Sequence, residues 1–103
     1  MNLILHRAGA YQLYSTISDR PCFDRALTLD ELTRVIELSE GESAVNALPE
    51  RLARAHAKGC SSLDDETLAD CIALNRAGPN EEAVPHDEFV RRWLTLPEKE
   101  KTE

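Results

Sequence analysis

Residues 28–41, with the sequence TLDELTRVIELSEG, carry the clearest structural signal in the chain. Thr28 and Glu31 have the spacing of a capping box, in which the threonine hydroxyl accepts from the Glu31 amide and the Glu31 carboxylate reaches back. Apolar side chains then recur at helical spacing and form one stripe: Leu29, Leu32, Val35 and Ile36. Glycine commonly stops a helix. The segment therefore predicts an amphipathic helix that ends at Gly41.

The chain before this helix has the pattern of a β-hairpin over residues 2–17. A short apolar run is interrupted at Gly9, which is free to adopt a positive φ. From Tyr11 to Ile17 the side chains then alternate, a pattern typical of a half-buried strand. Pro21 has no amide hydrogen, so we expect it to end strand pairing.

Three more helices are expected after Gly41. The first starts near Pro49, whose fixed φ suits the first helical position, and runs to Lys58. The second begins after Ser61-Ser62 and ends at Gly78-Pro79, and the third begins at Pro85. Charged residues suit the dipoles of the last two helices: Asp64, Asp65 and Glu66 at one start, Asp87 and Glu88 at the other, and Arg91 and Arg92 near the final end.

Together these elements predict an α+β fold in which a short N-terminal β-hairpin packs on three to four short α-helices. Residues 1–96 would form a single small domain, since 103 residues suit one hydrophobic core. Residues 97–103 would be a charged tail that frays. Because an isolated two-stranded sheet is marginal in water, the hairpin must lean on the helices or pair with another chain.

Charge and composition exclude several classes of protein. The formal net charge of −7 argues against direct nucleic-acid binding and against a membrane-surface protein, because both usually need a positive field. No apolar run approaches the roughly 18 residues of a membrane span, and the first residues lack the basic lead of a signal peptide. Three unevenly spaced cysteines do not form a disulfide framework. These features favour a cytoplasmic protein. The nine arginines against three lysines are typical of a GC-rich bacterial or viral genome, so we expect a bacterial or infected host cell.

No catalytic motif is recognisable. The chain has no phosphate-binding glycine loop, no Gly-x-Ser-x-Gly elbow and no His-Glu-x-x-His helix. A Cys22 nucleophile paired with His6 or His86 is a weak alternative, because such residues occur by chance in most chains. A zinc site would need a fourth ligand and a tighter pair than the chain offers in His56, Cys60 and Cys71. We expect structural thiols, no metal, no cofactor and no enzymatic activity. The alternative is a small enzyme whose active site cannot be recognised from a single sequence.

Three sets of side chains are candidate contact surfaces. The first is acidic and consists of Glu37, Glu40, Glu42, Asp64, Asp65, Glu66 and Asp70. The second is a basic stripe at helical spacing, formed by Arg51, Arg54 and Lys58. The third is apolar, and we expect it to contact a second copy in a homodimer or a target, because little sequence remains to cover it: Phe89, Trp93 and Leu94.

The basic stripe raises the alternative of a nucleic-acid-linked regulator. Residues 49–58, a turn over 59–62 and the segment from residue 63 have the lengths of a helix-turn-helix. The second helix, however, would approach DNA with Asp64, Asp65 and Glu66, which the phosphates repel. We therefore rank this reading below a protein partner.

In size, charge and missing motifs, the chain is similar to the compact accessory proteins that phages and mobile elements carry. This resemblance implies an inhibitor or modulator of a host macromolecule, including an anti-defence role. We expect a small acidic protein-binding module that covers a basic surface, such as the nucleic-acid-binding face of a host protein.

Overall fold

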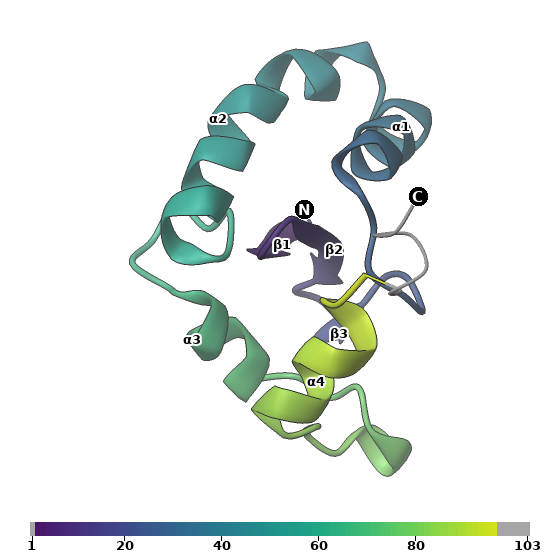
Figure 1. Cartoon of the computed structure of the whole chain (residues 1–103), viewed down its shortest axis with the longest axis vertical. Coiled ribbons are helices and arrows are strands. Elements are labelled where there is room, and N and C mark those ends of the chain that lie inside the picture. Colours follow the sequence, from purple (N-terminus) through teal and green to yellow (C-terminus); the bar gives the residue numbers. More distant parts are fainter. Residues whose placement is uncertain (1, 97–103) are drawn as a thin grey trace.

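In the computed structural model, which describes residues 2–96, a three-stranded antiparallel sheet lies between helices (Figure 1). Its strands, in the order β1-β2-β3, are Leu3–Arg7, Ala10–Ser15 and Arg20–Pro21. The helices are α1 (Leu29–Glu40), α2 (Glu42–Lys58), α3 (Leu68–Ala73), the short 3₁₀ helix η1 (Pro79–Glu81) and α4 (His86–Trp93). The expected α+β class and N-terminal hairpin are confirmed. The fraying predicted for residues 97–103 lies outside the described part.

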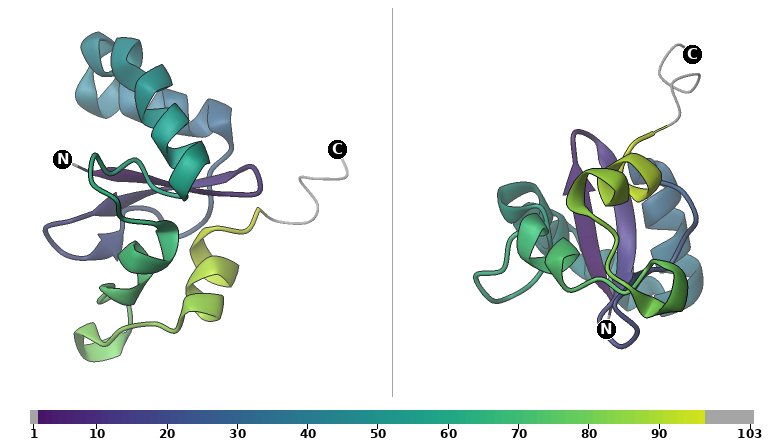
Figure 2. Two further views of the ribbon diagram at one scale, coloured as in Figure 1. Left: turned by 90° about the vertical axis from the view of Figure 1, so that its left-hand side faces the viewer. Right: turned by 90° about the horizontal axis from the view of Figure 1, so that it is seen from below.

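The sheet is covered on both faces. Helices α1 and α2 pack on one side, and α3 and α4 on the other (Figure 2). Because neighbouring strand residues point to opposite faces, Ile4 enters the core beneath α1 and α2, and Leu5 enters the core beneath α3 and α4. The expectation of a half-buried strand was wrong, since Ala10 to Tyr14 of β2 are all buried.

The sheet differs from the prediction at the end of β2. Strand β2 stops at Ser15, short of residue 17, and Ile17 is 91% exposed in the following turn. Pro21 does not end pairing but lies opposite Tyr14 in β3. Proline is tolerated there because β3 is an edge strand. The ladder then continues through the Cys22 amide, which donates to the Leu13 carbonyl over 2.7 Å.

The first two helices are separated only by Gly41. Helix α1 has the predicted capping box and the predicted end. Helix α2, however, begins at Glu42, and Pro49 lies inside it instead of at its start. The turn before Pro49 is stabilised by burial, because Leu48 and the partly buried Val45 pack into the core shared with α1.

Helix α3 is much shorter than predicted. It begins at Leu68, after a second capping box formed by Thr67 and Asp70, and it ends at Ala73. Buried Asn75 accounts for the end of the helix. Its side-chain amide donates to the carbonyls of Ile72 and Val84, and its side-chain oxygen accepts from the amides of Ala77 and Val84. Such side-chain bonds to the backbone compete with a continuing helix. Helix α4 follows Pro85 as predicted. Among residues 2–96, no helix is long and apolar enough to span a bilayer.

Candidate functional site

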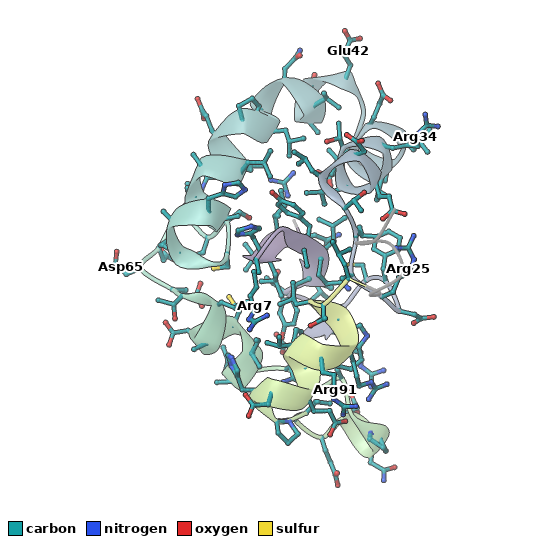
Figure 3. All side chains as sticks on the ribbon, viewed as in Figure 1. Arg7, Arg25, Arg34, Glu42, Asp65 and Arg91 are labelled. Carbon is teal, nitrogen blue, oxygen red and sulfur yellow. The ribbon has the colours of Figure 1, made fainter. Side chains whose placement is uncertain are left out.

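The connection from α2 to α3 forms a protruding loop, residues 61–66, which we call the acidic loop (Figure 3). The sequence prediction put its carboxylates in the first turn of a helix, whereas the structure places them in this loop. Leu63 is 85% exposed, and the neighbouring Asp64 and Asp65 are exposed as well. Within the described residues, neither aspartate carboxylate makes a hydrogen bond or an ion pair. The loop therefore presents one apolar side chain beside two unpaired negative charges.

The base of the acidic loop is tied to β1. The Ser61 amide donates to the Ile4 carbonyl over 2.9 Å, and the Ile4 amide donates to the Ser61 hydroxyl over 2.8 Å. Inside the loop, the Ser62 hydroxyl accepts from the Asp64 amide and donates to the Glu66 carboxylate. Serine turns of this kind replace helical hydrogen bonds. The loop is thus ordered by its own short side chains.

The predicted basic stripe holds the same region from α2. Arg54 donates to the Ser61 carbonyl over 2.9 Å, and Lys58 donates to the carbonyls of Ser62 and Asp64. Arg51 is only 7% exposed; it bonds the Asn2 carbonyl and pairs with Glu40 at 3.5 Å. These three side chains do not form a solvated stripe, because each donates to a carbonyl of the acidic loop or of the residue before β1. Such carbonyl partners cannot be read from the spacing of charges in a sequence.

The seven acidic candidates do not form one surface. Glu37, Glu40 and Glu42 lie at the junction of α1 and α2, and the acidic loop follows the other end of α2. The 17 residues of α2 separate the two groups by roughly 24 Å, and Figure 3 shows Glu42 and Asp65 well apart. Asp70 is engaged in the capping box of α3, where its carboxylate accepts from the amide of the N-cap residue Thr67. Asp64 and Asp65 remain as the unpaired pair on the loop.

The prediction that α4 presents an apolar interface is wrong. Phe89 and Leu94 have no exposed surface, and Trp93 is 7% exposed. All three belong to the core between the sheet and α3, where the Phe89 ring lies 5.0 Å from the Trp93 ring. The prediction failed because β2 is buried on both faces, so α4 has a sheet surface to cover.

The grouping of His56, Cys60 and Cys71 is divided in the structure. Cys60 and Cys71 are buried in the core beneath α3, whereas His56 is exposed on α2. Within residues 2–96, no three histidine, cysteine or acidic side chains are placed to share a metal ion. Cys22 is exposed, but partial desolvation of its sulfur by the surrounding chain, followed by the nearby Glu40, raises the pKa of its thiol. A raised thiol pKa lowers the thiolate fraction that a nucleophile needs.

The sequence reasoning missed an aromatic cluster at the hairpin end. His6 stacks on His56 with ring centroids 4.3 Å apart, and the Tyr11 hydroxyl lies 2.8 Å from Nε2 of His56. Burial, with the nearby charge of His56, lowers the pKa of His6. The pairing of His6 with Tyr11 follows from the hairpin register, but the approach of α2 depends on the tertiary fold.

A groove of about 460 Å³ lies between residues 23–27 and α1. Its walls are mainly apolar and include Phe23, Leu27 and Val35. Arg25 and Glu31 form an ion pair beside it. None of the side chains predicted as contact residues lines this groove. The groove is formed where the segment after β3 folds back on α1, and this tertiary contact has no signal in the sequence.

Similarity to other proteins adds nothing to these contacts. No protein-family model matches the chain, and no significant match to it was found among curated proteins or among solved structures. What the chain does must therefore be inferred from the chemistry of its own surface. Among the described residues, the acidic loop is one place where unpaired charges lie beside an exposed apolar side chain, and of the candidate contact residues predicted from the sequence it holds Asp64 and Asp65.

Proposed function

We propose that the chain is a non-enzymatic binding module that attaches through the acidic loop to a basic surface of another protein. The supporting observation is the combination of an 85% exposed Leu63 with the unpaired carboxylates of Asp64 and Asp65. Protein interfaces commonly have an apolar anchor inside a charged or polar rim. In this proposal, Leu63 is the anchor, and the two aspartates face cations on the partner.

The fixed conformation of the acidic loop favours binding. Association costs free energy whenever a flexible segment must be fixed. Arg54, Lys58 and Ser62 already hold the loop backbone, so little of this cost remains. The cations of Arg54 and Lys58 are directed at backbone carbonyls. The aspartate charges are therefore free to attract a basic partner and to raise its association rate.

The partner that fits best is a protein with a nucleic-acid-binding face, because such faces are rich in arginine and lysine. Attachment of an acidic module would block that face. This role agrees with the resemblance to accessory proteins that inhibit or redirect a host factor. The net charge of −7 also disfavours direct contact with phosphates, so a protein partner is preferred to DNA or RNA.

The test compares two charge reversals of equal size. Asp64→Lys with Asp65→Lys changes the loop, and Glu37→Lys with Glu42→Lys makes the same change at the far end of α2. A partner captured from bacterial lysate would be purified, and its association rate with each variant measured at several salt concentrations. We expect the loop variant to bind roughly ten-fold more slowly at low salt, with a smaller difference at high salt, and the control to bind normally.

A third variant, Leu63→Ser, tests the apolar anchor. It should raise the dissociation rate and leave the association rate unchanged, because it removes contact area and no charge. Normal binding by the loop variant, together with failure of the Glu37 and Glu42 control, would place the contact at the other end of α2 and reject the proposal.

A further inference from the structure

A cationic pocket of about 280 Å³ lies between the hairpin and α4. Arg7, the last residue of β1, contributes one wall, and His86, Asp87, Val90 and Arg91 contribute the α4 side. These α4 residues are spaced so that they share one face of the helix. Arg7 points to the same side of the sheet as Leu5, whose side chain is in the core beneath α4. Figure 3 shows Arg7 and Arg91 on these two neighbouring elements.

The two arginines of this pocket are not neutralised. Three other arginines pair with glutamates, whereas several exposed arginines of the described chain do not: the pairs are Arg25 with Glu31, Arg51 with Glu40 and Arg92 with Glu88. In the part of the chain that the structure describes, the side chains of Arg7 and Arg91 make no ion pair or hydrogen bond. Among the described residues that line the pocket, Asp87 is the one carboxylate. The fixed charge of the lining is therefore positive in a chain whose total charge is negative.

We propose that this pocket binds a phosphate-class anion, as inorganic phosphate or as the phosphate group of a small monoester. Guanidinium groups suit this ligand because their planar N–H groups match two phosphate oxygens at once. The first turn of α4 adds partial positive charge, and His86 lines the pocket there. Val90 offers an apolar wall to an organic group on the phosphate. The volume, near the lower end of small-molecule sites, suits a small ligand.

The pocket does not depend on the proposed protein-binding role. The acidic loop lies beyond α2 and the pocket lies against α4, so a ligand could occupy one site without covering the other (Figure 3). Loss of phosphate binding would leave the acidic-loop proposal intact, and loss of the protein partner would leave the phosphate site intact.

The experiment titrates inorganic phosphate into isotopically labelled protein and follows the Nε–H signals of Arg7 and Arg91 by NMR. Sodium chloride at matched ionic strength measures the general salt effect, and phenyl phosphate tests a monoester. We expect saturable shifts with both phosphates. Arg7→Gln and Arg91→Gln should each weaken binding by roughly ten-fold, because each removes one of the two guanidinium partners.

Arg34→Gln and Arg76→Gln are matched controls, since both remove an exposed arginine elsewhere on the chain. They should change phosphate affinity by less than about two-fold, the small effect of a distant charge in salt. Equal weakening by all four variants, or a chloride effect equal to that of phosphate, would reduce the site to general charge and overturn the proposal. Phosphatidic acid vesicles are titrated as a further arm, and binding to these vesicles with no binding to either soluble phosphate would also overturn the proposal.

Discussion

The side-chain amide of Gln12 donates a hydrogen bond to the main-chain carbonyl of Trp93, 81 residues later in the sequence, over 3.2 Å. The same amide nitrogen also lies within hydrogen-bond distance of the Phe23 and Arg25 carbonyls, and its oxygen accepts from the Phe23 amide. Gln12 has no exposed surface. One buried side chain of β2 thus joins the sheet, the segment after β3 and the end of α4.

Gln12→Leu should therefore be among the most destabilising substitutions in this chain. Leucine leaves the buried Trp93 carbonyl and the partly buried main-chain groups of Phe23 and Arg25 without this partner, and an unsatisfied buried group costs about 1–3 kcal/mol. We expect the free energy of unfolding to fall by roughly 3 kcal/mol in urea denaturation. Asn46→Leu, at an exposed position of α2, is the control and should change it by less than about 0.5 kcal/mol. A Gln12 variant as stable as the control would show that these bonds contribute little.

Gln12 also shows what could not be predicted from the sequence. The hairpin and α1 were predictable because their signals, a glycine turn and a capping box, act between residues close in the chain. The role of Gln12 was not, because its partners lie on distant segments. The early start of α2 was missed for the same reason, since the turn before Pro49 depends on burial of Leu48 against α1.

The candidate site was predicted only in part. Asp64 and Asp65 were identified as exposed acidic residues, but in a helix, because the Thr67 and Asp70 capping box that starts α3 later in the chain was overlooked. The charges of Arg54 and Lys58 were visible in the sequence, yet their partners are backbone carbonyls, which every residue carries. Only the fold shows which carbonyl a cation reaches.

The two tyrosines of β2 should respond in opposite ways to loss of the hydroxyl. Among the described residues, the Tyr14 hydroxyl is the only buried side-chain polar atom without a hydrogen-bond partner, whereas the Tyr11 hydroxyl bonds His56. Tyr14→Phe removes an unsatisfied polar group and should raise the free energy of unfolding by up to about 1 kcal/mol. Tyr11→Phe should lower it by about 1 kcal/mol. Denaturation of both variants side by side makes the comparison, and a loss of stability in Tyr14→Phe would show that its hydroxyl has a stabilising partner.

Stability should depend on pH through His6. Its pKa is lowered in the folded chain, first by burial and then by His56, so the unfolded chain binds this proton more readily. The contribution is fully present above the unfolded value near 6.5 and is lost as pH falls below it. Glu31 does not contribute to the pH dependence in this range. Hydrogen bonds from Arg25 and the Thr28 amide lower its pKa to about 2, so its stabilising contribution is lost only as pH falls below the ordinary pKa of a glutamate.

Urea denaturation between about pH 5 and 7 measures this effect. The free energy of unfolding should rise with pH in wild type, and His6→Gln should flatten the rise because its side chain does not titrate. His86→Gln, at an exposed histidine of α4, should keep the wild-type slope. An unchanged slope in His6→Gln would assign the effect to another group.

The junction of α2 and the acidic loop should tolerate only glycine at position 59. Gly59 has φ 87° and ψ −8°, and a β-carbon there would lie 2.5 Å from the β-carbon of Leu68. Gly9, at φ 82° in the hairpin turn, has open space around the same position. Gly9→Ala should thus cost only the left-handed strain of about 1–2 kcal/mol, whereas Gly59→Ala should cost roughly 3 kcal/mol or more, because α3 must also move. The difference between the two denaturation midpoints isolates the contact, and equal losses would mean that Leu68 does not pack against Gly59.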